Sequence, residues 1–430
     1  MMRRIVPVVC VLCASLSLAS LASAQAVRLS LKEAETRAIE THPQIRAGHY
    51  NALASGEVAR EAKSAFFPTV FASFTGAGAQ DGTRIAAGGL NNPTILDRLA
   101  AGFSASQLLT DFGRTNNLVQ GQLLRADAQE QDVATRTAEV RLQVDSAYYS
   151  ALGAEAVLKV AQQTVEARQL VADQVETLAA SGLKSSLDAS FAKVNLSQAK
   201  LLLVQARNDV QAAFARLTAA IGSMQTSVYE LEDEPLPPPP PDDGALLVAQ
   251  AIRDRPEVAT RQLSQRAASK FAAAERALWF PAISAVGAAG FTPFHQVGLT
   301  DRYSALGVNV TLPLTNGNLY SARHSEAAFR AQAEQEALRD VETQITRDVT
   351  VAWLSARTAF EKVDLTNQLL TQANDALELA QARYTLGLSS IVELTQAQLN
   401  KTEAEIEGIR TRYEYQTRSA TLGFQLGALK

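Results

Sequence analysis

The fold is decided by one stretch of sequence, Arg114 to Ser181, which reads RTNNLVQGQLLRADAQEQDVATRTAEVRLQVDSAYYSALGAEAVLKVAQQTVEARQLVADQVETLAAS. Its 68 residues contain no proline and two glycines, so little in it would break a helix. A helix of that length extends about 100 Å. A second stretch of 68 residues, Leu319 to Leu386, has neither proline nor glycine. Uninterrupted helices far longer than about 25 residues are typical of coiled coils and helical arrays.

Apolar residues after the first stretch and within the second recur at coiled-coil spacing. Steps of three and four residues separate Val210, Phe214, Leu217 and Ile221 in the first case, and Leu370, Ala373, Leu377, Ala380 and Tyr384 in the second. Each stretch ends at a glycine flanked by leucine, in Ser181-Gly182-Leu183 and Leu386-Gly387-Leu388. Glycine suits a helix end because it adopts positive φ. We therefore predict two long helical hairpins, over residues 114–222 and 319–427.

The sequence contains an internal duplication. Pro43 and Pro256 are 213 residues apart, as are Pro68 and Pro281. Farther along, the spacing becomes 205 residues for five pairs: Gly102 and Gly307, Thr110 and Thr315, Gly182 and Gly387, Asn195 and Asn400, Gly222 and Gly427. The eight residues of difference fall in a loop-like segment between Gly78 and Gly102. We predict a first repeat over 25–234, a proline-rich linker over 235–244, and a second repeat over 245–430.

Each repeat also contains a helix and two strands before its helical hairpin. Residues 31–63 have helical character, and Pro68 follows them. Strand hairpins are predicted at about 66–110 and 281–314. In the second, Leu306, Val308 and Val310 alternate with small or polar residues such as Gly307 and Asn309, which is typical of a half-buried strand.

The first 24 residues have the pattern of a signal peptide. Arg3 and Arg4 precede an apolar run, and Ala22-Ser23-Ala24 provides the small residues of a cleavage site. The alternative, a transmembrane anchor, lacks a stop-transfer pattern. Both cysteines, Cys10 and Cys13, lie in this segment, so we expect a mature chain without cysteine and without a lipid anchor. A net charge of −4, from 40 basic and 44 acidic residues, gives no basic excess to bind nucleic acid.

The four predicted strands need further strands to pair with if they enter a membrane. Unpaired backbone groups cost several kcal/mol each in lipid, so strands that enter a membrane must close into a barrel. Membrane barrels begin at about eight strands, and side chains fill the interior of a barrel of that size, so it would not serve as a pore. Three chains would pool twelve strands and gather the helices into a tube. The alternative is a soluble periplasmic coiled-coil scaffold with two small sheets packed face to face.

The sequence resembles the TolC-like outer-membrane efflux protein family. The resemblance lies in residues 29–34 (LSLKEA), 42–45 (HPQI), 66–68 (FFP), 107–114 (QLLTDFGR), 279–281 (WFP), 382–388 (ARYTLGL) and 394–398 (LTQAQ). It implies a mainly α fold with a membrane β-barrel, built as a homotrimer in the outer membrane of a Gram-negative bacterium, with a helical tunnel in the periplasm. The implied partners are a periplasmic membrane-fusion adaptor, an inner-membrane pump and outer-membrane lipid. It implies neither an enzyme nor a cofactor, and leaves the exported solute open among drugs, metal cations and proteins.

The resemblance also implies a gate at the helical turns. Asp188 matches a gate carboxylate, Tyr384 a gate tyrosine, and Glu393 a member of an acidic constriction ring. Ser389 stands where the best-known member has a gate arginine and Gln396 where it has a ring aspartate, so we expect rearranged ion pairing, with Lys184 as a substitute cation. Gly182, Leu183, Gly387 and Leu388 are the implied adaptor-docking tips.

Each of these gate residues also has a purely structural interpretation. Asp188 and Glu393 could simply begin the returning helices, where carboxylates interact favourably with the helix dipole. Tyr384 continues a heptad seam and could serve only in packing. The four histidines, His42, His49, His295 and His324, show no metal-ligand spacing, and no nucleophile or phosphate-loop motif is present.

Overall fold

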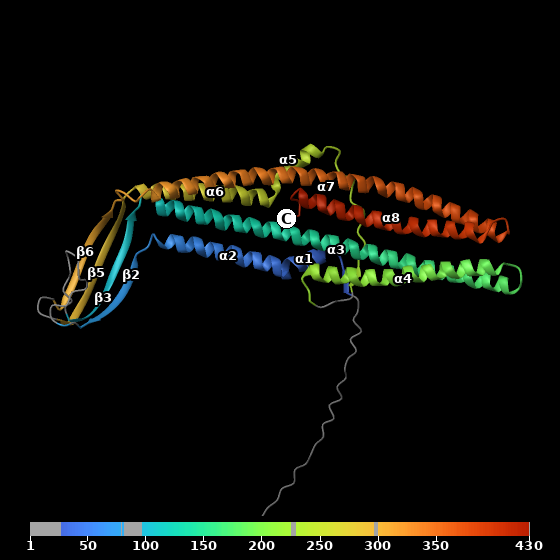
Figure 1. The fold of residues 1–430 in the computed structure, drawn as a ribbon, viewed down its shortest axis with the longest axis horizontal. Coiled ribbons are helices and arrows are strands. Elements are labelled where there is room, and N and C mark those ends of the chain that lie inside the picture. Colours follow the sequence, from blue (N-terminus) through green and yellow to red (C-terminus); the bar gives the residue numbers. More distant parts are fainter. Residues whose placement is uncertain (1–26, 79, 81–96, 225–228, 296–299, 430) are drawn as a thin grey trace, which may run out of the picture.

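The computed structural model describes residues 27–78, 80, 97–224, 229–295 and 300–429. The predicted signal peptide and most of the loop in which the two repeats differ in length lie outside these residues. The described chain is a long array of helices with a β-sheet at one end and two helical turns at the other (Figure 1). The prediction of a mainly α fold with four sheet strands and long helical hairpins is confirmed.

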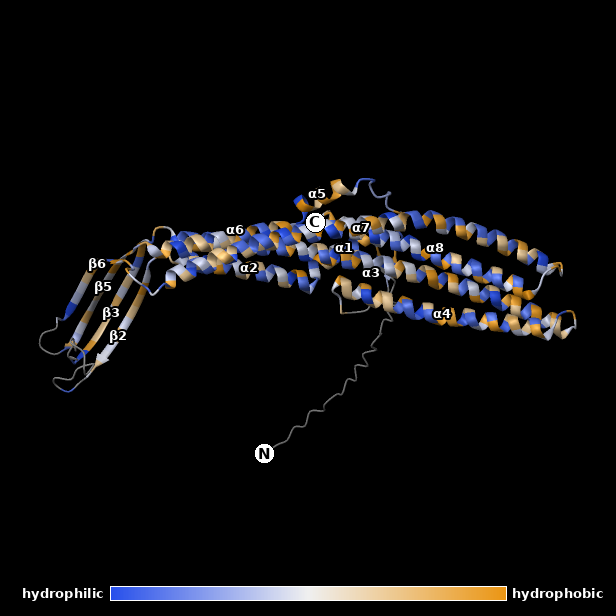
Figure 2. Cartoon of the chain, turned by 45° about the horizontal axis from the view of Figure 1, so that its top comes forward, coloured by the Kyte–Doolittle hydropathy of each residue, from blue (hydrophilic) through white to orange (hydrophobic). Residues whose placement is uncertain are grey.

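Two hairpins of long helices run the length of the array. Helix α3 (Arg114–Ala180) returns as α4 (Ser186–Ile221), and α7 (Leu319–Thr385) returns as α8 (Ile391–Gln425). Apolar and polar residues alternate along all four helices instead of gathering in one segment (Figure 2). This pattern is the one expected of helices that pack side by side along their whole length.

The four strands form one antiparallel sheet, not two sheets packed face to face. Its order is β2 (Thr69–Ala77), β3 (Arg98–Thr110), β5 (Ala282–His295) and β6 (Arg302–Thr311). Strands β3 and β5, from different repeats, pair over most of their length, with Gly102 opposite Gly290. The two repeats therefore share a sheet whose free edges are β2 and β6.

Shorter helices precede the strands of each repeat. The predicted helix over 31–63 is interrupted at His42, giving α1 (Leu31–Thr41) and α2 (Pro43–Ser64). Pro43 takes the first position of α2, and His42 adopts extended backbone before it, as residues before proline tend to do. The second repeat has α5 (Gly244–Asp254), α6 (Pro256–Arg276) and a short 3₁₀ helix, η1 (Ala277–Trp279).

A two-stranded parallel ribbon lies near the middle of the array and, with α1 and α5, forms a belt there (Figure 1). Strand β1 (Val27–Leu29) pairs with β4 (Tyr229–Leu231). Tyr148 of α3 fastens this ribbon to the helices, because its Oη lies 2.7 Å from the carbonyl oxygen of Leu29 and accepts the Glu232 N–H at 3.0 Å. The linker that follows is held by Tyr415 and Gln416 of α8, which contact the carbonyl oxygens of Pro238 and Glu234.

The short helices continue the returning helices end to end. Gly222, at the end of α4, has φ 82° and lies so close to His42 that an added Cβ would be 3.0 Å from its Cα. Gly427, at the end of α8, has φ 72° and lies equally close to Asp254. The glycines are repeat equivalents, and each begins a stack onto a proline-initiated helix. Helices α4 and α2 therefore form one row, and α8 and α6 another.

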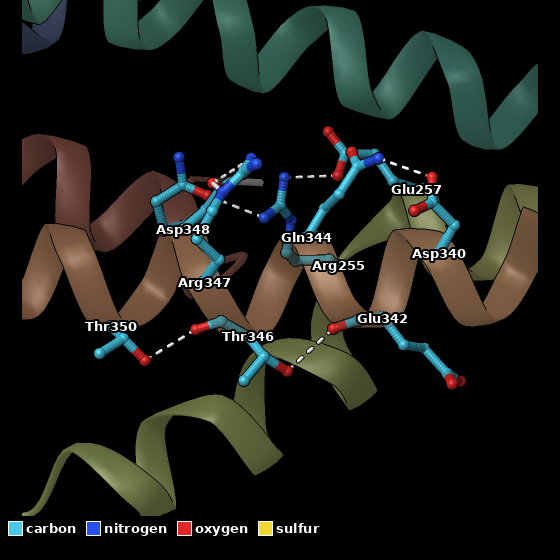
Figure 3. A network of polar contacts seen from close by, with 10 residues as sticks. Arg255, Glu257, Asp340, Glu342, Gln344, Thr346, Arg347, Asp348 and Thr350 are labelled. Atoms are coloured by element: carbon cyan, nitrogen blue, oxygen red, sulfur yellow. Dashed lines mark hydrogen bonds and ion pairs between the residues drawn. The ribbon is translucent and has the colours of Figure 1, made fainter.

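Arg255 secures the second of these junctions. Its side chain is 7% exposed, donates from one terminal nitrogen to Gln425 Oε1 at 2.8 Å and pairs with Glu257 through the other. Figure 3 shows this pair above helix α7, where Gln344 bonds Asp340 and Arg347 contacts Asp348. Polar contacts thus stabilise the junction at which α6 stacks on the end of α8.

The rows of helices form a single curved layer. Helix α3 packs on α2 and α4 at one side and on α6 and α8 at the other, and α7 packs on α6 and α8. The order across the layer is therefore the α2–α4 row, α3, the α6–α8 row and α7. Among the described residues, no helix is long and apolar enough to cross a membrane.

Candidate functional site

The tips of the two hairpins, residues 181–185 and 386–390, lie at the far end from the sheet (Figure 1). Gly182 has φ 75° and Gly387 has φ 73°, so both turns use the left-handed conformation that glycine adopts without strain. The N–H of Leu183 bonds the Leu178 carbonyl oxygen at 2.9 Å, and that of Leu388 bonds the Arg383 carbonyl oxygen at 2.8 Å. Both leucine side chains are exposed, at 71% and 68%.

One cluster of predicted residues connects the two hairpins. Lys184 of the first tip places Nζ 4.2 Å from the ring centroid of Tyr384 at the end of α7, a cation–π contact. Burial, and secondarily the charge of Asp188, raise the pKa of Tyr384. Asp188 lies in the first turn of α4, where its Oδ2 accepts the Ser185 N–H at 3.3 Å. The structure therefore brings Lys184, Tyr384 and Asp188 together, while Asp188 also completes a helix cap.

Glu393 has a basic partner of its own. Its Oε1 is 3.3 Å from Nε of Arg383, across the turn of the second hairpin. The two side chains are 49% and 45% exposed, so water screens the pair and its contribution to stability is small. The Glu393 N–H also bonds the Ser390 hydroxyl at 3.4 Å. Arg383 thus supplies a positive charge at the tip, although it does not occupy the position of Ser389, where the resemblance implied a gate arginine.

A buried polar contact joins the hairpins just above the tips. We call Arg168 of α3, Asn195 of α4 and Thr395 of α8 the inter-hairpin joint. Asn195 donates from Nδ2 to Thr395 Oγ1 at 2.8 Å, and Arg168 donates to the Asn195 carbonyl oxygen at 3.1 Å. Arg168 is 6% exposed and Asn195 8%, and burial lowers the pKa of Arg168.

Apolar side chains surround the joint. Ile391 and Leu394 of α8 are each 3% exposed and pack in one cluster with Ala172 and Val175 of α3 and with Leu196 of α4. In such surroundings a polar group without a partner costs about 1–3 kcal/mol. The joint therefore holds the two hairpins in one relative position.

Sequence reasoning missed Arg383, Arg168 and Thr395 as members of the site. Arg383 lies four residues before Gly387, which places it near the facing helix of the same hairpin, so the spacing was an available signal. Asn195 stood out only as a repeat equivalent of Asn400. Asn400 makes no comparable contact, because it is exposed and its side chain bonds Gln396 in the same helix. Among the described residues, no group of three or more His, Cys, Asp or Glu side chains is placed to hold a metal ion.

A family model described as "Outer membrane efflux protein" matches residues 36–223 and 247–428, which is most of the chain. The chain belongs to the outer membrane efflux protein family. Outer membrane protein OprJ of Pseudomonas aeruginosa is 27% identical over 299 residues, covering 67% of this chain and 61% of OprJ. Outer membrane protein TolC of Escherichia coli strain K12 is 22% identical over 408 residues, covering 90% of this chain and 80% of TolC.

Solved structures share the fold of this chain. A membrane protein from Pseudomonas aeruginosa has a TM-score of 0.81 at 24% identity, covering 92% of this chain and 93% of that one. The outer membrane protein VceC from Vibrio cholerae has a TM-score of 0.77 at 16% identity, covering 92% and 96%. Members of the outer membrane efflux protein family are export channels of the outer membrane, so the predicted location and class of function are confirmed, and the periplasmic scaffold is set aside.

Proposed function

We propose that three copies of this outer-membrane efflux protein close into one channel, a twelve-stranded barrel continued by a helical tunnel. The single observation that carries the proposal is the open sheet. It has four strands, two free edges, and an apolar face on which Leu306 and Phe74 are 88% and 84% exposed. Unpaired edges in lipid are too costly to persist, so β2 of one copy must pair with β6 of the next.

The helical layer supports the same closure. Its two outermost members are the α2–α4 row and α7, and both carry large exposed apolar side chains: Leu187, Val194, Leu201 and Val204 on α4, and Leu354, Leu365, Leu369 and Leu379 on α7. Monomers rarely leave such contiguous apolar surface uncovered. The two faces lie at opposite sides of the layer, so their contact is head to tail and generates a ring.

The hairpin tips are the part of the channel that meets the periplasmic adaptor and, through it, the inner-membrane pump. Leu183 and Leu388, with Leu386 and Val392, form an exposed apolar surface at the end farthest from the sheet. Such a surface suits a protein partner and not water. The energy and the choice of solute come from the pump, and this chain supplies the passive conduit, with no catalytic step of its own.

The tips are also the gate of the conduit. The Lys184, Tyr384 and Asp188 cluster and the inter-hairpin joint hold the second hairpin against the first. Threefold symmetry places three Glu393 carboxylates and three Arg383 guanidinium groups around one axis. Charges so arranged at a narrow opening bias which ions pass.

Planar-bilayer recording of the purified protein tests this function. Insertion should give discrete ion-conducting steps, and Lys184→Met should raise the open fraction by removing the cation from Tyr384. Lys200→Met is a matched control, because Lys200 is an exposed residue of α4 outside the tip contacts. If properly folded protein gives no conducting steps, the channel function is wrong.

A further inference from the structure

The two faces of the sheet have different chemistry. Pairing places Ser73, Gly102, Gly290 and Tyr303 in one row across the four strands, and Phe71, Ser104, Ala288 and Ala305 in the next row on the same face. Gly307, Asn309 and Thr311 continue that face along β6. The opposite face carries Phe103, Leu306 and Val308. In a membrane barrel the apolar face meets lipid and the small polar face lines the lumen; this step rests on the proposed function.

The luminal face is uncharged along the described strands at residues 69–75, 102–106, 284–290 and 303–311: its residues there are threonine, serine, asparagine, glycine, alanine, Val286, Phe71 and Tyr303. Ion selectivity needs charged or strongly polar groups at close range. Such a wall sorts solutes by size, so its bulky side chains decide what passes. Tyr303 stands near the outer end of the wall, one residue into β6.

The Tyr303 ring lies across two neighbouring strands that have no side chains beneath it. A Cβ added to Gly102 of β3 would overlap Tyr303 Oη and would be 3.1 Å from its Cζ. A Cβ added to Gly290 of β5 would be 2.6 Å from the same Cζ. The ring therefore rests against the backbone of both strands, pointing along the wall and away from the free edge of β6.

We propose that Gly102 and Gly290 form a seat that holds the Tyr303 ring against the wall, and that this seat sets the largest solute that the outer barrel passes. Three copies would carry three such rings. With the seat empty of side chains, the rings lie flat and the bore stays wide. A methyl group in the seat lifts each ring into the lumen.

The lack of cysteine in the predicted mature chain allows a direct test. Ser106→Cys places a thiol on the luminal face, paired with Thr69 and Val286, on the tunnel side of the Tyr303 row. Thiol reagents of increasing size, a methanethiosulfonate and maleimide-linked polyethylene glycols, are added outside intact cells. The measured quantity is the labelling rate of the large reagent divided by that of the small one. Gly102→Ala should lower this ratio at least about threefold.

Two further variants separate the ring from the added methyl group. Gly307→Ala puts the same methyl on the same face, but its nearest neighbour, Val286 Cγ2, is 3.9 Å away, so the ratio should not change. Tyr303→Phe in the Gly102→Ala background removes the overlapping oxygen and should restore most of the ratio. Gly290→Ala is a poorer choice, because its Cβ would lie 2.5 Å from the Ala101 carbonyl oxygen, whereas the Cβ of Gly102→Ala would lie 2.9 Å from the Ala289 carbonyl oxygen and needs a smaller backbone adjustment.

The outcomes test the Tyr303 seat and the proposed channel separately. An unchanged ratio in Gly102→Ala overturns the seat, as does a lowered ratio that Tyr303→Phe leaves lowered. If Gly102→Ala reduces the yield of assembled protein, the seat requires Tyr303→Phe to recover it, and failure to recover overturns the proposal. If the Ser106→Cys thiol does not react even with the small reagent in assembled protein, the luminal face itself is misassigned and the proposed channel fails.

Discussion

Replacing Asn195 with alanine should open the gate. The substitution removes the 2.8 Å hydrogen bond from Asn195 Nδ2 to Thr395 Oγ1, which joins the two hairpins across 200 residues of sequence. The backbone carbonyl that accepts from Arg168 stays in place, so α3 and α4 should remain paired. The loss therefore falls on the contact between hairpins and not on the hairpins themselves.

The size of the effect follows from burial and symmetry. Asn195 is 8% exposed, and a buried hydrogen bond of this kind contributes about 1 kcal/mol. Three copies that open together would lose about 3 kcal/mol, and each 1.4 kcal/mol is a factor of about ten, so the ratio of open to closed channels should rise about 100-fold. Independent opening of the copies would give only about fivefold each.

Single-channel recording at low voltage measures this ratio. Asn400→Ala is the matched control, because Asn400 is the repeat equivalent of Asn195 but its side chain accepts a hydrogen bond from Gln396 on an exposed helix face. Thr395→Val should reproduce most of the Asn195→Ala effect, and the double variant should add little to either. The reasoning is refuted if Asn195→Ala gives the same open fraction as Asn400→Ala.

Three further predictions concern the tips and the belt. Glu393→Gln leaves Arg383 unpaired and should shift the reversal potential toward anions, whereas Arg383→Gln should shift it toward cations; equal reversal potentials in both would show that this pair does not face the ion path. Leu183→Asp with Leu388→Asp should abolish export in cells while the isolated channel still conducts, and export that survives both changes would place docking elsewhere. Burial, and then neighbouring Glu35, raise the pKa of the Asp145 carboxyl from 3.8 to about 8, with Arg141 opposing. Between these two values the folded chain holds a proton that the unfolded chain has released, so Tm should fall as pH rises from about 4 to about 8 and then level off, and Asp145→Asn should remove this fall.

Much of the helical architecture could be predicted because it depends on local sequence. Gly182 and Gly387 interrupt otherwise unbroken helical stretches, and the structure turns at both. The break at His42 was also signalled, by the proline after it, but the apolar residues on either side continue one helical period and mask it. The pairing of β3 with β5 could not be foreseen, because alternation defines the faces of a strand but not its neighbours.

The side-chain contacts of the site were less accessible from sequence. Lys184 and Tyr384 could be assigned to the tips from their distance to the glycines, whereas their contact depends on how the two hairpins pack. The link between Asn195 and Thr395 depends on the rotation of α4 relative to α8, which no local pattern specifies. Tyr303 looked like any strand residue until the register placed two glycines beneath its ring.

The mass of the protein extracted from the outer-membrane fraction tests the central claim most directly. Four strands with two free edges require closure with other copies, and the order of helices across the layer allows a head-to-tail ring. Native mass spectrometry in detergent should give three times the mass of the mature chain, with no stable monomer. Recovery of the chain as a monomer in the soluble periplasmic fraction would contradict the account.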